Sequence, residues 1–214
     1  MNDSQFPSGA YAHSFGLEEL VQSGLVATPE ALERFLLRQI VPGLLAFDLP
    51  VLDRAHAAAA EENEPALAAV DAELDAWKLA AETRTASRQL GSRRLALVRK
   101  LAPSPFVERY AAGGHPCHHL VVCALELREA PAEAAAAAFA YQTLSGHAYA
   151  AMKLMRLGQE RAQTLVRGAF LRLLEQKSSQ AATARAARRV GWFNPVLEIA
   201  SLRHARARER LFIS

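Results

Sequence analysis

Residues 3–18 read Asp-Ser-Gln-Phe-Pro-Ser-Gly-Ala-Tyr-Ala-His-Ser-Phe-Gly-Leu-Glu, and this stretch combines a turn with the start of a helix. Pro7 fixes its own backbone angle and disfavours helix at the residue before it. The serine that follows is a good helix cap, so the sequence predicts a short helix that begins there and ends near Gly24. Tyr11 and His13 would project from its first turns.

The composition predicts an all-α protein. The chain has 214 residues, 51% of them hydrophobic, and Ala, Leu, Glu and Arg dominate while β-branched residues are few. This is enough chain to bury a sizeable core. By length the chain forms one or two helical domains. The segment 195–214 is basic and ends in apolar residues, which suits docking to an acidic protein partner.

The net charge of +3 is mildly basic and does not by itself call for nucleic acid. Cys117 and Cys123 are the only cysteines, which fits a reducing compartment. The first residues show no signal peptide, and no uninterrupted apolar stretch is long enough to cross a membrane. The sequence thus predicts a cytoplasmic protein that binds neither membrane nor nucleic acid.

Apolar residues recur at helical spacing along most of the chain. Pro42-Gly43 and Pro50 are expected to end or kink helices, and residues 177–180 form a break similar to a linker. The patterns predict helices over about 29–41, 44–61, 64–77, 82–101, 105–112, 117–128, 131–155 and 160–176.

Two of these helices carry the polar and small residues that bear on function. In helix 64–77 the expected apolar stripe is Leu67, Val70, Leu74 and Trp77, with Asp71, Glu73 and Asp75 facing water. In helix 82–101 the residues Arg84 and Arg88 share one face. A basic face of this kind is usually exposed to solvent. The small residues Ser87 and Gly91 beside it would let another helix approach closely.

A histidine-rich loop precedes helix 117–128. It contains four potential metal ligands: His115, Cys117, His118 and His119. The two adjacent histidines would point about 100° apart on a helix, and no second cluster completes a tetrahedral site. We favour a structural role for the loop and keep these four residues only as weak candidates for a metal site.

The stretch 3–18 resembles the signature of the urease accessory protein F family (UreF), D-S-x-F-P-x-G-x-[FY]-x-H-S-x-G-L-E. Other stretches resemble the family's R-x-A-S-x-x-x-G-x-R element, its L-G-Q turn and its C-terminal pattern. The matching residues are Asp3, Ser4, Phe6, Pro7, Gly9, Tyr11, His13, Ser14, Gly16, Leu17, Glu18, Arg84, Ala86, Ser87, Gly91, Arg93, Leu157, Gly158, Gln159, Gln163, Ile199, Ala200, Leu202, Arg203, His204, Arg210, Leu211, Phe212 and Ser214.

The resemblance implies an all-α homodimer of the UreF type that has no catalytic activity and no cofactor. Each copy would be a compact multi-helix bundle, a single domain over residues 1–214 with a partner-docking tail at about 195–214. It would bridge UreD (UreH) and the nickel-carrying GTPase UreG on apo-urease, gate GTP hydrolysis by UreG and support nickel insertion. The small residues around Ser87/Gly91 and Ser145/Gly146 are the expected dimer faces. The expected partner-binding residues are Pro7, Tyr11, His13, Arg84, Tyr141, Gln159, His204, Arg210, Leu211 and Phe212.

Three further expectations can be compared with a structure. The basic, apolar-ended segment 195–214 should carry few core contacts, so removing residues 203–214 should cost binding before it costs fold. A nickel-binding metallochaperone that uses His115–His119 remains an alternative function. A nucleic-acid-binding helical protein is another, based on the arginines of 84–100 and 185–210, although aromatic residues are not interleaved with them.

Overall fold

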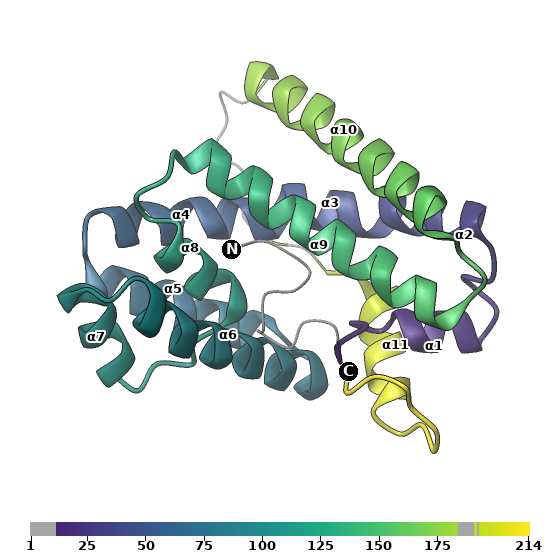
Figure 1. Cartoon of the computed structure of the whole chain (residues 1–214), viewed down its shortest axis with the longest axis horizontal. Helices are drawn as coiled ribbons and strands as arrows, with labels where there is room; N and C mark the ends of the chain where they lie inside the picture. Colours follow the sequence, from purple (N-terminus) through teal and green to yellow (C-terminus); the bar gives the residue numbers. More distant parts are fainter. Residues whose placement is uncertain (1–11, 184–190, 192) are drawn as a thin grey trace. The chain divides into compact units, whose positions relative to one another are not determined.

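The computed structural model describes residues 12–183, 191 and 193–214, and every regular element in these residues is a helix (Figure 1). The predicted all-α fold is confirmed. The helices are α1 Leu17–Gln22, α2 Pro29–Phe35, α3 Val41–Gly43, α4 Leu49–Ala60, α5 Glu64–Trp77, α6 Ala81–Leu101, α7 Pro105–Ala112, α8 His119–Glu126, α9 Ala132–Leu154, α10 Gln159–Thr183 and α11 Pro195–His204.

Four helices begin at a capping side chain followed within two residues by proline, and for α2, α5 and α7 these starts agree with the predicted helices. In each case the cap accepts a hydrogen bond from a backbone N–H of the first turn, and the proline has no N–H left to satisfy there. The caps are Thr28 for α2, Asn63 for α5, Ser104 for α7 and Asn194 for α11.

The prolines at 42 and 50 do not end the helix that contains them, which corrects the prediction. The chain is helical from Pro29 to Ala60 because π-helical stretches at Leu36–Ile40 and Leu44–Asp48 absorb both prolines. A proline ring collides with the carbonyl four residues earlier in an α-helix, and here each such carbonyl lies in a wider π turn. In the second case the Ala46 carbonyl accepts a hydrogen bond from Gly191 N at 3.4 Å instead.

The continuity of this helix also changes the expectation about membranes. In the part of the chain that the structure describes, Pro29–Ala60 is the one helix long and apolar enough to pass for a membrane span. Core helices of soluble proteins pass the same test, and 56% of its most apolar stretch is buried in the protein. This helix is therefore weak evidence for a membrane segment.

Two other boundaries differ from the predictions. The predicted start of the first helix after Pro7 lies outside the described residues. The helix is not continuous from there to Gly24, because Phe15 and Gly16 both have positive φ angles and α1 begins at Leu17. The expected break at 177–180 is also absent, since α10 runs on to Thr183. The expected terminator Gly24 does have a left-handed backbone, two residues after α1 ends.

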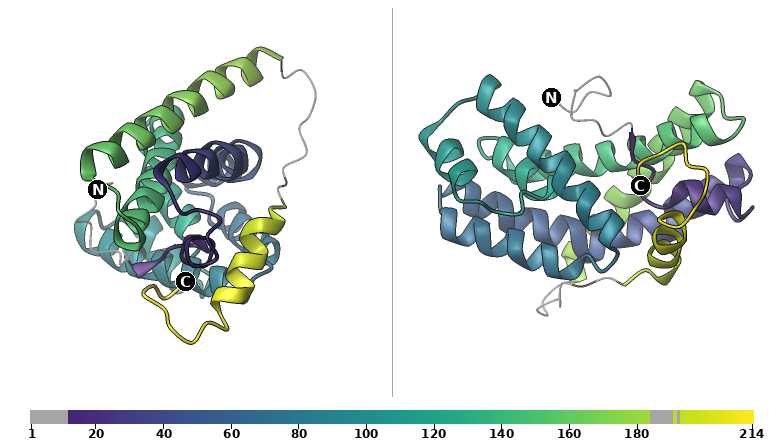
Figure 2. Two further views of the ribbon diagram at one scale, coloured as in Figure 1. Left: turned by 90° about the vertical axis from the view of Figure 1, so that its right-hand side faces the viewer. Right: turned by 90° about the horizontal axis from the view of Figure 1, so that it is seen from below.

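The chain divides into two compact units. The first unit contains residues 51–139 and His13, and the second contains residues 14–50 and 140–214. In the first unit α6 packs against α8, and α5 and α7 lie against them. In the second unit α10 runs along α2 and α3, and α11 lies beside α1 (Figure 2). The predicted organisation as a single domain with a docking segment stays a prediction.

Close approach in the first unit depends on Gly91. A Cβ atom built there would lie 1.8 Å from the Cys117 carbonyl oxygen. Ser87, one turn earlier on α6, is 6% exposed and contacts His118. The small residues therefore do admit a neighbouring segment, as predicted, but that segment belongs to the same chain. Ser87 and Gly91 are not free to form a dimer face, which corrects that expectation.

Candidate partner-binding surfaces

The buried carboxylate of Glu18, on α1, organises the C-terminal segment of the second unit. Its oxygens accept hydrogen bonds from His204 Nε2 at 2.9 Å, from Leu211 N at 2.6 Å and from Phe212 N at 2.9 Å. Glu18 is only 1% exposed, so these donors replace the water that a carboxylate otherwise binds. Burial alone would raise the Glu18 pKa, but the bonds from Leu211, His204 and Phe212 outweigh it and lower the pKa.

Further contacts tie the same segment to residues 14–16. The Ser214 carbonyl accepts hydrogen bonds from Ser14 N, from Ser14 Oγ at 3.0 Å and from Phe15 N at 3.1 Å. Gly16, with φ 86°, lets α11 come close, because a Cβ there would lie 3.3 Å from the Ala200 Cβ. Residues 14–18 of the quoted motif are thus in direct contact with the C-terminal segment within one unit.

These contacts correct the expectation that residues 203–214 carry few core contacts. His204 and Phe212 are 0% and 5% exposed, and Lys153 lies over the Phe212 ring at 5.3 Å from its centroid. Removing residues 203–214 would leave the Glu18 carboxylate buried without these donors. Loss of residues 203–214 should therefore lower the free energy of unfolding as well as weaken any binding to a partner.

The same segment holds other apolar side chains out in solvent. Leu211 and Ile213 are 63% and 54% exposed on either side of buried Phe212. On α11 three apolar residues at helical spacing are also exposed, and Phe193 precedes that helix. We call this set the tail surface; it consists of Phe193, Val196, Ile199, Leu202, Leu211 and Ile213.

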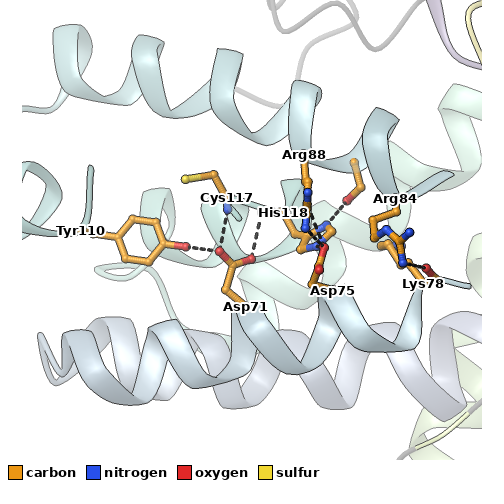
Figure 3. Close-up of polar contacts among 9 residues, drawn as sticks. Asp71, Asp75, Lys78, Arg84, Arg88, Tyr110, Cys117 and His118 are labelled. Atoms are coloured by element: carbon orange, nitrogen blue, oxygen red, sulfur yellow. Dashed lines mark hydrogen bonds and ion pairs between the residues drawn. The ribbon is translucent and has the colours of Figure 1, made fainter. Parts of the chain in front are cut away.

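A second buried carboxylate, Asp71 on α5, organises the first unit (Figure 3). It accepts hydrogen bonds from Tyr110 Oη at 2.8 Å, from Cys117 N at 2.6 Å and from His118 N at 2.9 Å. Asp71 is fully buried, which corrects the prediction that it faces water. Burial and the neighbouring carboxylate raise the Tyr110 pKa, so the hydroxyl stays a donor.

His118 continues this network toward the surface. Its Nδ1 lies 3.0 Å from Ser87 Oγ and its Nε2 lies 3.0 Å from Asp75, which also binds Arg88. Burial lowers the His118 pKa, while Asp75 acts in the opposite direction. A serine, a histidine and an aspartate in line suggest nucleophilic chemistry, but Ser87 and His118 are 6% and 0% exposed. The arrangement is therefore suited to fixing α5, α6 and α8 rather than to meeting a substrate.

The four weak metal candidates have separate contacts. His115 lies 3.1 Å from Glu64, and Cys117 uses its backbone on Asp71, where burial raises the thiol pKa to about 11. His119 lies against Cys123 and Phe139, and burial lowers its pKa to about 3. Among the described residues, no group of three or more His, Cys, Asp or Glu side chains gathers around a point that could hold a metal ion.

The other predicted partner-binding residues are spread over both units. Pro7 and Tyr11 lie outside the described residues. His13 is buried in the first unit, where burial and Arg93 lower its pKa. Arg84 Nη1 donates to the Lys78 carbonyl at 3.2 Å.

In the second unit, Gln159 is exposed at the start of α10. Tyr141 is 41% exposed, with its ring edge-on to Phe170 and its hydroxyl 3.4 Å from Gln163. Arg210 is exposed beside the tail surface.

Among the predicted partner-binding residues that the structure describes, His204, Leu211 and Phe212 come together around Glu18. Glu18 belongs to the quoted motif but not to the predicted site. Asp71 also had a signal: Leu67, Val70, Asp71 and Leu74 follow the i, i+3, i+4, i+7 spacing of one helix face. A carboxylate on that face has to find donors when it is buried.

The described part of the chain is all-helical, and its C-terminal segment holds apolar side chains in solvent. Comparison with known proteins is more specific. The UreF family model matches residues 26–170. The chain is 30% identical to the urease accessory protein UreF of Bacillus sp. (strain TB-90) over 220 residues, covering 99% of this chain and 95% of the relative. It is 32% identical to UreF of Mycobacterium bovis (strain BCG / Pasteur 1173P2) over 216 residues, with the same coverage. The chain belongs to the UreF family of urease accessory proteins.

Proposed function

We propose that this protein is the scaffold of a urease maturation complex in the cytoplasm. It bridges UreD, which docks on apo-urease, and the GTPase UreG, and it gates GTP hydrolysis so that nickel release is coupled to the nucleotide state. The observation that carries the proposal is the tail surface, in a chain that belongs to the UreF family. Exposed apolar side chains on a segment fixed from behind by a buried carboxylate are typical of a binding surface.

The tail surface is assigned to UreD. Leu211 and Ile213 flank Phe212, whose backbone N–H is held by Glu18, so their positions are set before a partner arrives. Docking therefore costs little ordering of this segment. Basic residues such as Arg210 at its edge favour a partner surface that carries carboxylates.

The experiment mixes the protein with UreD and UreG from the same source and follows the complex by gel filtration. Leu211→Asp/Ile213→Asp should lose UreD by at least about tenfold in affinity, since two exposed apolar anchors are replaced by charge. Leu101→Asp, at a residue equally exposed (61%) at the end of α6, is the matched control and should still bind. Retention of UreD by the double variant would show that the tail surface is not its docking site.

The coupling is tested on the same proteins. UreG should hydrolyse GTP at a different rate in the ternary complex than alone, and apo-urease should be activated with nickel only when all three proteins are present. An unchanged GTPase rate would remove the gating role and leave only the bridge.

We also propose that the scaffold is a homodimer that uses apolar residues of α9 and α10. Tyr141, Leu171 and Leu174 are 41%, 47% and 38% exposed in the second unit, and Ser145 of the earlier expectation is buried. Light scattering at micromolar concentration should give a dimer for the wild type and a monomer for Leu171→Arg. Leu101→Arg is the control for the added charge.

A further inference from the structure

The end of α5 and the loop that follows it present two large apolar side chains to solvent in the first unit. Trp77 is 43% exposed and Leu79 is 64% exposed, although helical spacing predicts Trp77 in the apolar stripe with Leu74. Leu74 is 1% exposed, so the stripe ends one turn before Trp77. Tryptophan is the residue type most enriched at the centres of protein interfaces, and its exposure on a folded surface needs a reason.

The loop is held in place by several bonds. Arg84 Nη1 donates to the Lys78 carbonyl at 3.2 Å, and Lys78 N donates to the Leu74 carbonyl at 3.3 Å. The Trp77 side chain forms a hydrogen bond with Glu73, whose two oxygens bind Arg54 at 3.0 and 2.6 Å. The indole is thus oriented through its polar edge while part of its ring stays in solvent. A fixed aromatic side chain loses little conformational freedom when a partner covers it.

Basic residues are close to the two apolar ones in the sequence, and Figure 3 shows three of them, Lys78, Arg84 and Arg88, near Asp75. None of the ion pairs among the described residues includes Lys78 or Arg84; Arg84 Nη1 donates to the Lys78 carbonyl. Arg88 follows one turn later on α6 and pairs with Asp75 while its side chain stays 45% exposed. An apolar centre with uncompensated positive charge at its edge fits a partner surface in which an apolar side chain is surrounded by carboxylates.

We propose that Trp77, Leu79 and the adjoining Lys78 and Arg84 form a second docking surface, and that its occupant is an acidic face of the GTPase UreG. This rests on the proposed function, because a bridge needs two separate surfaces and the tail surface is assigned to UreD. The network of Asp71, His118 and Asp75 beneath α5 and α6 supplies the rigid base for it.

The test measures the binding of UreG and of UreD separately to the full-length protein. Trp77→Ser/Leu79→Ser should weaken UreG binding at least tenfold and leave UreD binding unchanged. Leu101→Ser, at an exposed leucine on the far end of α6, is the matched control. Lys78→Glu, which removes no buried contact, should weaken UreG binding in the same direction, and added salt should weaken wild-type binding to UreG.

The outcomes separate this assignment from the bridge itself. Unchanged UreG affinity in the double variant and in Lys78→Glu, or loss of UreD in place of UreG, would overturn the second docking surface while the bridge stands. A wild-type protein that binds UreD but not UreG would overturn the bridge and this assignment with it. Thermal melts identify a variant that fails to fold, and in that case Lys78→Glu alone decides.

Discussion

Asp71 in the first unit and Glu18 in the second are stabilised in the same way, by protein hydrogen-bond donors that replace water around a buried carboxylate. Each is a buried carboxylate on a helix, and each accepts hydrogen bonds from two successive backbone N–H groups. Side chains complete both sites: Tyr110 at Asp71, and His204 and Gln22 at Glu18. Asp71 holds Cys117 and His118 at the start of α8. Glu18 holds Leu211 and Phe212. A carboxylate with three or more donors is stable in a dry site because each lost water is replaced.

The two sites differ in what they hold. Asp71 fixes residues packed on both sides, since the Cys117 carbonyl lies directly over Gly91. Glu18 fixes a segment with only one buried side, since Leu211 and Ile213 remain in solvent. The same chemistry thus builds a core in one unit and presents a surface in the other. Opening the Asp71 site should unfold its unit, whereas opening the Glu18 site should release only the tail.

The largest effect is expected at Gly91, which lies beneath the loop held by Asp71. Gly91→Ala places a Cβ 1.8 Å from a backbone oxygen that cannot move without breaking the bonds to Asp71, so the free energy of unfolding should fall by about 3 kcal/mol. Gly146→Ala is the control, because it is also helical and nothing lies within 4 Å of its Cβ. It should gain about 0.5 to 1 kcal/mol. Equal urea midpoints for the two variants would refute the close packing.

The next largest effects on stability are expected at the two buried carboxylates. Asp71→Ala leaves three buried donors without an acceptor and should lower the global free energy of unfolding by about 2 to 3 kcal/mol. Glu18→Ala should cost less globally, but amide exchange in residues 205–214 should become fast, because the tail opens locally. Glu133→Ala, at an exposed acid on α9, controls for loss of charge. Protection of the tail in Glu18→Ala would contradict the division between core and surface.

Much of the fold could be predicted because it follows from local rules. A capping residue close to a proline indicates the starts of α2, α5 and α7, and the small residues of α6 predict close packing against a neighbouring segment. The sequence could not say which segment would use that space, since Gly91 accommodates a loop of its own chain as readily as a second copy. Such choices depend on contacts between residues distant in the sequence.

The candidate site was harder to predict. The charge of Asp71 predicts a position facing water, whereas its spacing from Leu67 predicts the buried face. The sequence does not show that Tyr110 and two loop amides supply the hydrogen-bond donors that a buried carboxylate needs. Pro50 was expected to disturb its helix, but a π turn and Gly191 accommodate it. Glu18 lies in the most specific motif, yet its role depends on residues more than 180 positions away.

The smallest effect is a pH dependence that separates Glu18 from the rest of the molecule. Its pKa in the folded protein lies below the ordinary value of 4.5, because bonds from Leu211, His204 and Phe212 outweigh burial. A group whose pKa is lower when folded adds stability above its unfolded pKa, and this contribution is lost as the pH falls through the folded pKa. Glu18→Gln keeps an acceptor but cannot titrate.

The stability difference between wild type and Glu18→Gln should therefore be largest at about pH 6.5 and shrink toward about pH 3.5, measured by urea denaturation at each pH. Other carboxylates with lowered pKa values, such as Asp75 with its bonds to Arg88 and His118, titrate in both proteins and cancel in the difference. A difference that stays constant across this range would mean that the tail is held by packing of Phe212 and the Ser14–Ser214 bonds, and that the Glu18 charge adds nothing.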